Sequence, residues 1–167
     1  MGLDRSRKKR EETLLRCDAG AGTEREINWA LNEGYGLLTK LKSHQRSVKL
    51  VRSVTTWYPD PKVRGRSVGW IEAPHAFARE TLQVAIRSER TVSGKRKRTD
   101  RVLLTSLSPE EAVALMGAPI QDAKEPDKVA LAVAHLYDQR GGGVETENRQ
   151  DKQGLGLTRR NKKRFHA

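Results

Sequence analysis

The N-terminal part of the chain constrains the fold most strongly, because its signals alternate between strand and helix. Thr13 to Cys17 is a short run with the composition of a strand, and a glycine-rich turn follows it. Thr23 with Glu26 three residues later has the pattern of a capping box, which predicts the start of a helix. Tyr35 to Leu41 then predicts a second strand. Strand, helix and strand in this order favour a partly parallel sheet in an α/β fold.

The middle of the chain has a different pattern, which predicts antiparallel strands. Short runs alternate apolar and polar residues, as in Leu82 to Arg87. The dipeptide Ser93-Gly94 lies between two such runs and predicts a hairpin. The four basic residues that follow it, Lys95 to Arg98, predict positive charge at the hairpin tip.

Helical signals return towards the C-terminus. Ser108 and Glu111 form a second capping-box pattern. Apolar residues from Val129 to Tyr137 recur at the spacing of an amphipathic helix. The sequence therefore predicts three segments: 1–54 with strands and helices, 55–107 rich in β-strands, and 108–167 helical with a basic tail.

The charge of the chain indicates a polyanionic partner. Its 33 Lys and Arg exceed its 21 Asp and Glu, so the formal net charge is +12 over 167 residues. Such an excess is expected of a protein that binds nucleic acid. No stretch approaches the roughly 20 apolar residues that span a bilayer, so a membrane protein is not expected. The chain is expected to be cytoplasmic. The single Cys17 excludes an intramolecular disulfide, and four scattered histidines lack the spacing of zinc ligands.

One run near the C-terminus suits a site that handles phosphate. Tyr137, Arg140, Glu145 and Lys152 place an aromatic ring, a base, an acid and a base at fixed intervals. If the segment is helical, Glu145, Arg149 and Lys152 share one face. A carboxylate flanked by cations suits a metal ion that holds phosphate.

These four residues resemble the Y-R-E-K signature of DDE transposases from bacterial insertion sequences, in which the Glu is the third catalytic carboxylate. Six residues separate Glu145 from Lys152, as the signature requires. Four residues separate Arg140 from Glu145, where the signature has three, so Glu147 is the alternative third acid.

The resemblance extends upstream to the segment from Leu14 to Thr23, which is similar to the strand end that carries the family's second catalytic Asp. That residue would be Asp18. The family implies an incomplete RNase H-like core of mixed sheet and helices, interrupted by a β-rich insertion at 55–107. Only Asp4 precedes Asp18, and it lies in a charged lead without a strand-like run. The resemblance thus implies a C-terminal portion of a transposase, truncated and inactive because it lacks the first catalytic Asp.

The resemblance also assigns roles in DNA cleavage and strand transfer. Two Mg²⁺ or Mn²⁺ ions would activate the attacking oxygen and stabilise the departing one, with Asp18 and Glu145 as catalytic metal ligands. The partner would be DNA at the transposon ends, bound by a homodimer on the bacterial nucleoid. The expected DNA-binding residues are Tyr137, Arg140, Lys152, Arg159, Arg160, Lys162 and Lys163.

Other interpretations stay open from the sequence. Asp18 has the setting of a turn residue, and Tyr137 lies on an apolar stripe, where core packing is at least as well supported as DNA contact. His135 has no partner pattern, and Trp29 is expected to pack. The chain could be a non-catalytic basic DNA-binding protein or a truncated regulator of a full-length transposase. The composition also permits an RNA-binding protein, but nothing in the sequence resembles an aromatic RNA-binding motif.

Overall fold

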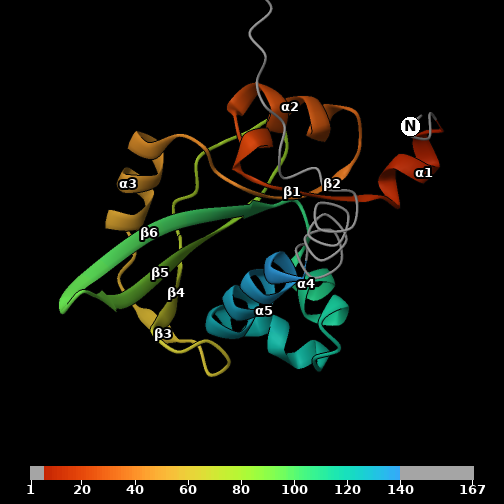
Figure 1. Cartoon of the computed structure of the whole chain (residues 1–167). Helices are drawn as coiled ribbons and strands as arrows, with labels where there is room; N and C mark the ends of the chain where they lie inside the picture. Colours follow the sequence, from red (N-terminus) through yellow and green to blue (C-terminus); the bar gives the residue numbers. More distant parts are fainter. Residues whose placement is uncertain (1–5, 140–167) are drawn as a thin grey trace, which may run out of the picture. The chain divides into compact units, whose positions relative to one another are not determined.

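A six-stranded mixed sheet lies at the centre of the computed structural model, which describes residues 6–139 (Figure 1). The spatial order of the strands is β1-β2-β6-β5-β4-β3. β1 and β2 are parallel, and every other neighbouring pair is antiparallel. The strands are β1 Leu14–Cys17, β2 Gly36–Lys40, β3 Trp57–Pro59, β4 Arg66–Trp70, β5 Leu82–Val92 and β6 Lys95–Thr105. The α/β class and the partly parallel sheet are confirmed.

Helices cover both faces of this sheet (Figure 1). One apolar cluster joins α2 and α3 to one face, and a second joins α4 and α5 to the other. The helices are α1 Arg7–Glu11, α2 Glu24–Asn32, α3 His44–Arg52, α4 Pro109–Leu115 and α5 Pro126–Asp138, with short 3-10 helices η1 Ala19–Ala21 and η2 Ile120–Lys124. In the described part of the chain, no helix is long and apolar enough to cross a membrane.

The N-terminal unit β1-α2-β2 forms as the sequence predicts. The Thr23 hydroxyl accepts from the backbone N–H of Glu26, whose carboxylate accepts in return from the Thr23 N–H. These two bonds satisfy amides that have no partner within the helix. Gly34 follows α2 with a φ of 86°, a left-handed conformation that glycine adopts without steric cost.

The β-rich middle segment does not form a sheet of its own. β6 pairs with β2, with Leu38 opposite Thr105 and Lys40 opposite Leu103. The parallel pair at the N-terminus and the antiparallel strands of the middle segment therefore share one sheet. One unit runs to Tyr137 and holds all six strands.

A buried charged cluster fastens α5 to the loop between β3 and β4. The Asp60 side chain is fully buried, and His135 Nε2 lies 3.0 and 3.1 Å from its two oxygens. Arg66 Nε donates to Asp60 Oδ2 at 2.6 Å, and the backbone N–H of Lys62 donates to Oδ1 at 2.8 Å. Burial raises the pKa of Asp60, but these hydrogen bonds and the Arg66 charge outweigh it and hold that pKa below its ordinary value. The sequence has no partner pattern for His135, and its partner Asp60 comes from a distant part of the chain.

Candidate nucleic-acid interface

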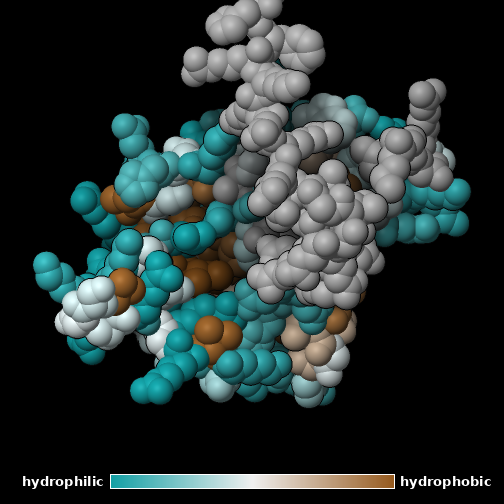
Figure 2. All heavy atoms as spheres, viewed as in Figure 1, coloured by the Kyte–Doolittle hydropathy of each residue, from teal (hydrophilic) through white to brown (hydrophobic). Residues whose placement is uncertain are grey.

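The two longest strands, β5 and β6, form a hairpin that extends past the rest of the sheet (Figure 1). β4 pairs with β5 only as far as Ser88, opposite Arg66. From Glu89 and its partner Arg98 to the tip, no third strand pairs with the hairpin among the described residues, and the loop residue Gly65 bonds only to Glu89 at its base. We call residues 87–101 the arm. In Figure 2 its surface, at the lower left, is mainly teal and white, as expected of charged and polar side chains.

The turn at the tip of the arm is the two-residue turn that the sequence predicts. Ser93 and Gly94 have φ values of 50° and 75°, and their neighbours Val92 and Lys95 are paired. Two successive left-handed residues characterise a type I′ turn, whose twist matches that of the strands. The turn therefore continues the ladder without a bulge and fixes which side chains share a face.

One face of the arm carries positive charge without acids. Side chains alternate between faces along a strand, and Arg90 lies opposite Lys97 in the register. Lys95 and Arg101 share this face, which continues the side of the sheet covered by α4 and α5. All four side chains are exposed, and none forms an ion pair within the described part of the chain. We call this the acid-free face.

The opposite face of the arm neutralises most of its charge, because it carries three arginines and two acids: Arg87, Arg96, Arg98, Glu89 and Asp100. Arg87 donates to both oxygens of Asp100, at 3.0 and 3.3 Å, and Arg98 Nε lies 3.5 Å from the same carboxylate. The Arg87 guanidinium also lies 3.8 Å from the centroid of a Trp57 ring, at cation–π distance. The charge excess of the arm is therefore concentrated on its acid-free face.

The loop between β3 and β4 supplies a further cation at the edge of the arm. Gly65 accepts from the Glu89 N–H at 2.7 Å and has a φ of 73°. A Cβ at Gly65 would lie 2.4 Å from the Glu89 oxygen, so only glycine permits this approach. The shallow cavity of about 430 Å³ at this edge is lined by three arginines and one acid, namely Arg64, Arg90, Arg96 and Glu89.

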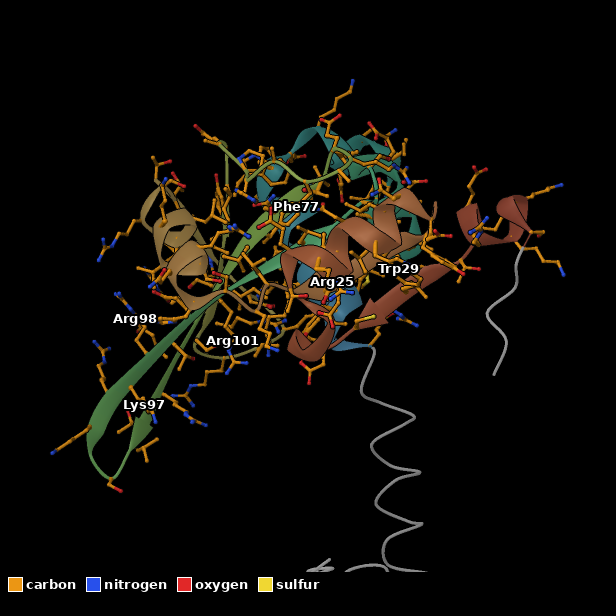
Figure 3. All side chains as sticks on the ribbon, turned by 90° about the horizontal axis from the view of Figure 1, so that it is seen from above. Arg25, Trp29, Phe77, Lys97, Arg98 and Arg101 are labelled. Carbon is orange, nitrogen blue, oxygen red and sulfur yellow. The ribbon has the colours of Figure 1, made fainter. Side chains whose placement is uncertain are left out.

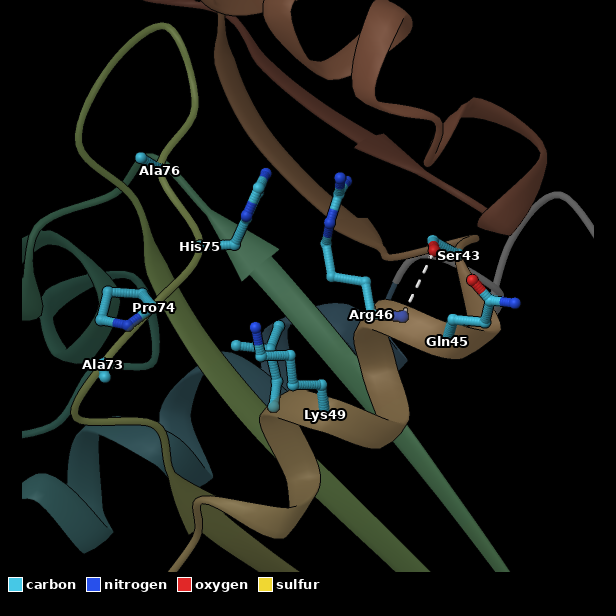
Figure 4. A pocket seen from close by; sticks show the side chains of 9 residues that line it. Ser43, Gln45, Arg46, Lys49, Ala73, Pro74, His75 and Ala76 are labelled. Atoms are coloured by element: carbon cyan, nitrogen blue, oxygen red, sulfur yellow. Dashed lines mark hydrogen bonds between the residues drawn. The ribbon is translucent and has the colours of Figure 1, made fainter.

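A second basic surface lies between α3 and the loop at residues 73–76. Figure 4 shows Arg46 and Lys49 on α3 and His75 on the facing loop, around a cavity of about 570 Å³. Gln83 fixes this loop by accepting from the His75 N–H at 3.0 Å and donating to the His75 carbonyl at 2.6 Å.

The charge of this second surface is partly neutralised. Arg46 Nη2 lies 2.7 Å from Glu24, and His75 Nε2 lies 3.7 Å from the same carboxylate. The hydrogen bond and the charge of Arg46 hold the pKa of Glu24 below its ordinary value. An anion here would compete with Glu24 for Arg46, so this surface is a weaker phosphate site than the acid-free face.

Asp18 occupies the position that the sequence analysis assigns to it, directly after β1. Its side chain is 68% exposed, and its Oδ1 lies 3.6 Å from Lys40 Nζ. Thr39 Oγ1 donates to the Asp18 carbonyl at 3.3 Å. An exposed carboxylate can act as a metal ligand. The ammonium group of Lys40 beside it would compete with a metal ion for this carboxylate. In the described part of the chain, no group of three or more His, Cys, Asp or Glu could hold a metal ion.

Most of the other predicted site residues lie outside the described residues. They are Arg140, Glu145, Glu147, Lys152, Arg159, Arg160, Lys162 and Lys163. Tyr137 is described, and its side chain is 7% exposed within the apolar cluster under α4 and α5. Tyr137 therefore packs in the core, which is one of the two interpretations that the sequence left open. A DNA contact by Tyr137 stays a prediction.

Aromatic and basic side chains are also exposed on α2. Trp29 is 51% exposed, so the prediction that it packs is wrong. Its ring centroid lies 6.0 Å from that of Tyr35. In Figure 3, Arg25 and Trp29 lie on α2, whereas Lys97, Arg98 and Arg101 lie along the arm.

The sequence analysis placed positive charge at the hairpin but did not separate its two faces. Arg90 and Arg101 were not singled out. The available signal was the two-residue turn, because it fixes the register and so places these residues on the same face as Lys95 and Lys97.

Comparison with protein-family models, with curated proteins and with solved structures finds no match for this chain.

Proposed function

We propose that this chain is a DNA-binding protein of the DDE transposase class and that its arm contacts the DNA. The observation that carries the proposal is the acid-free face, where Arg90, Lys95, Lys97 and Arg101 are exposed without an acidic partner among the described residues. Cations of this kind gain free energy by displacing the counterions condensed on a nucleic acid. The net charge of +12 adds long-range attraction.

Two features support the transposase class in particular. The first is the resemblance of Tyr137, Arg140, Glu145 and Lys152 to the family signature. The second is the β1-α2-β2 unit, in which Asp18 follows β1 at the carboxyl end of a parallel pair. We assign this unit to an incomplete RNase H-like core, with Asp18 as one ligand of a Mg²⁺ or Mn²⁺ ion and DNA at transposon ends as the substrate.

A second candidate is a non-catalytic DNA-binding protein that regulates a full-length transposase. The contact between Lys40 and Asp18 favours it, because a cation at 3.6 Å lowers the attraction of this carboxylate for a metal ion. This candidate needs the arm but no metal site. Asp18→Asn would then leave every DNA-dependent activity unchanged.

The proposal is tested by removing two charges from the acid-free face. In Arg90→Gln/Lys97→Gln we expect duplex DNA to bind about 10 to 50 times more weakly at 0.1 M salt, as follows from losing two phosphate or base contacts. Fluorescence anisotropy of a labelled duplex measures this loss. The matched control is Arg52→Gln/Lys124→Gln, which removes two exposed charges from α3 and η2.

Circular dichroism of all three proteins shows whether the sheet is preserved. The control should retain most of its affinity, because its charges lie on helices away from the arm and from the second basic surface. Equal losses in both variants would contradict the proposal that the arm is the binding site.

A further inference from the structure

We infer that the arm enters the major groove of duplex DNA with its acid-free face against the base edges. This inference rests on the proposed function and adds the form of the nucleic acid and the surface that is read. It is carried by three properties of the arm: an unneutralised pair of like charges, its dimensions, and the side chains at its tip.

The first property is the pairing of Arg90 with Lys97. These residues lie directly opposite each other, although like charges at this position destabilise a hairpin. On the other face the equivalent pair is Arg87 with Asp100, which forms an ion pair. A ligand that presents electron-rich acceptors between Arg90 and Lys97 would remove their repulsion and gain two charge-assisted hydrogen bonds.

The second property is the width of the arm. Two paired strands lie about 5 Å apart, and a two-stranded ribbon fits a major groove about 12 Å wide but not a minor groove about 6 Å wide. The four pairs from Glu89 and Arg98 to Val92 and Lys95 have no third strand beside them among the described residues. At about 3.3 Å per residue they extend roughly 10 Å before the turn, which is comparable with the groove depth of about 8.5 Å.

The third property is the chemistry of the acid-free face. Arg and Lys are the side chains that most often donate to O6 and N7 of guanine in the major groove. Val92 shares this face and is 46% exposed, so it offers an apolar contact for a thymine methyl group. The small pair Ser88 and Thr99 lies nearer the sheet and leaves room for the edge of a base.

Replacing guanine by 7-deazaguanine in a short G·C-rich duplex tests this arrangement, because it removes the N7 acceptor and leaves the phosphates and the minor groove unchanged. We expect the unsubstituted chain to bind the modified duplex about 10 times more weakly than the natural one, from the loss of good guanine contacts. Arg90→Gln/Lys97→Gln should bind both duplexes with the same reduced affinity. Arg52→Gln/Lys124→Gln should retain the discrimination of the unsubstituted chain.

The outcomes separate the inference from the proposed function. Equal affinity of the unsubstituted chain for the two duplexes, with the arm still required, would overturn insertion into the major groove and leave DNA binding intact. A failure to bind either duplex would overturn both. Preference for single-stranded over duplex DNA of the same sequence would also overturn the inference.

Discussion

Gly22 shows how one residue fixes the position of the loop that follows Asp18. A Cβ at Gly22 would lie 1.9 Å from the Lys40 carbonyl oxygen, whereas a Cβ at Gly20 would meet no atom within 4 Å. We therefore expect Gly22→Ala to lower the free energy of unfolding by about 1–3 kcal/mol, the usual cost of overpacking. Gly20→Ala is the matched control and should change stability little. Urea denaturation of the two variants measures the difference, and similar midpoints would contradict this account.

The Asp60 cluster predicts a dependence of stability on pH. Because the pKa of Asp60 is lowered in the folded protein, its charged form contributes stability above the ordinary value of 3.8. This contribution is lost as the pH falls from there through the lower pKa of the folded state. We expect Asp60→Asn to lower the free energy of unfolding by about 3 kcal/mol near neutral pH, because it removes the buried carboxylate that pairs with Arg66.

Urea denaturation of Asp60→Asn and of the unsubstituted chain over a range of pH checks this prediction. The difference between them should narrow below pH 3.8. Asp18→Asn is the control, since its side chain is 68% exposed and its removal should leave stability nearly unchanged at every pH. If the difference in free energy of unfolding stays constant down to the lowest pH, the charge of Asp60 contributes nothing to stability.

At this scale the sequence predicted local contacts and missed distant ones. Thr23 and Glu26 are three residues apart, so their reciprocal hydrogen bonds follow from spacing. Asp60 and His135 are brought together only by the packing of α5 on the sheet. No local pattern encodes such a pair.

Among the elements, the arm depends on its turn. Gly94 has a φ of 75°, and an alanine there would be strained by about 1–2 kcal/mol. We expect Gly94→Ala to open the arm more often and to weaken DNA binding, although no charge is removed. Ser93→Asn should preserve both, because asparagine suits the first position of this turn.

Amide hydrogen exchange at Arg90 and Lys97 measures opening of the arm, and anisotropy measures the affinity for DNA. Faster exchange without weaker binding in Gly94→Ala would show that the arm need not be formed before it meets DNA. Amides of the buried part of β6, such as that of Leu103, serve as the internal control.

The elements themselves were largely predictable, but their assembly was not. The capping boxes at Thr23 and Ser108 and the turn at Ser93 and Gly94 are local signals, and each marks an element that the structure contains. The pairing of β2 with β6 joins residues that lie far apart in the sequence. The sequence predicts that 55–107 is rich in β-strands but not that hydrogen bonds join these strands to β1 and β2 in one sheet.

For the whole molecule, the charge predicts a strong dependence of DNA binding on salt. A chain with a net charge of +12 gains affinity from counterion release, so the logarithm of the binding constant should fall linearly with the logarithm of the salt concentration. Because Arg90 and Lys97 are inferred to contact base edges, Arg90→Gln/Lys97→Gln should weaken binding with little change in this slope. A slope reduced by about 2, one unit for each lost phosphate contact, would instead show that both residues contact phosphates.

The metal-binding part of the proposed function depends on whether Asp18 shares a metal ion with an acid from the C-terminal segment. Mg²⁺ and Mn²⁺ prefer several oxygen ligands, and a single exposed carboxylate beside Lys40 would bind them only weakly. We therefore expect calorimetry to detect Mn²⁺ binding that Asp18→Ala and Glu145→Ala each weaken at least 10-fold, as expected for the loss of a ligand.

Glu147→Ala distinguishes the two candidate acids, and Glu110→Ala, on exposed α4, controls for loss of negative charge in general. Weakening by Glu147→Ala in place of Glu145→Ala would move the third acid by two residues and keep the transposase class. Mn²⁺ binding that neither Asp18→Ala nor a glutamate variant affects, in a chain that still binds duplex DNA, would instead favour the regulator. The arm would then be the functional part of the molecule, because its cations act on DNA without a metal ion.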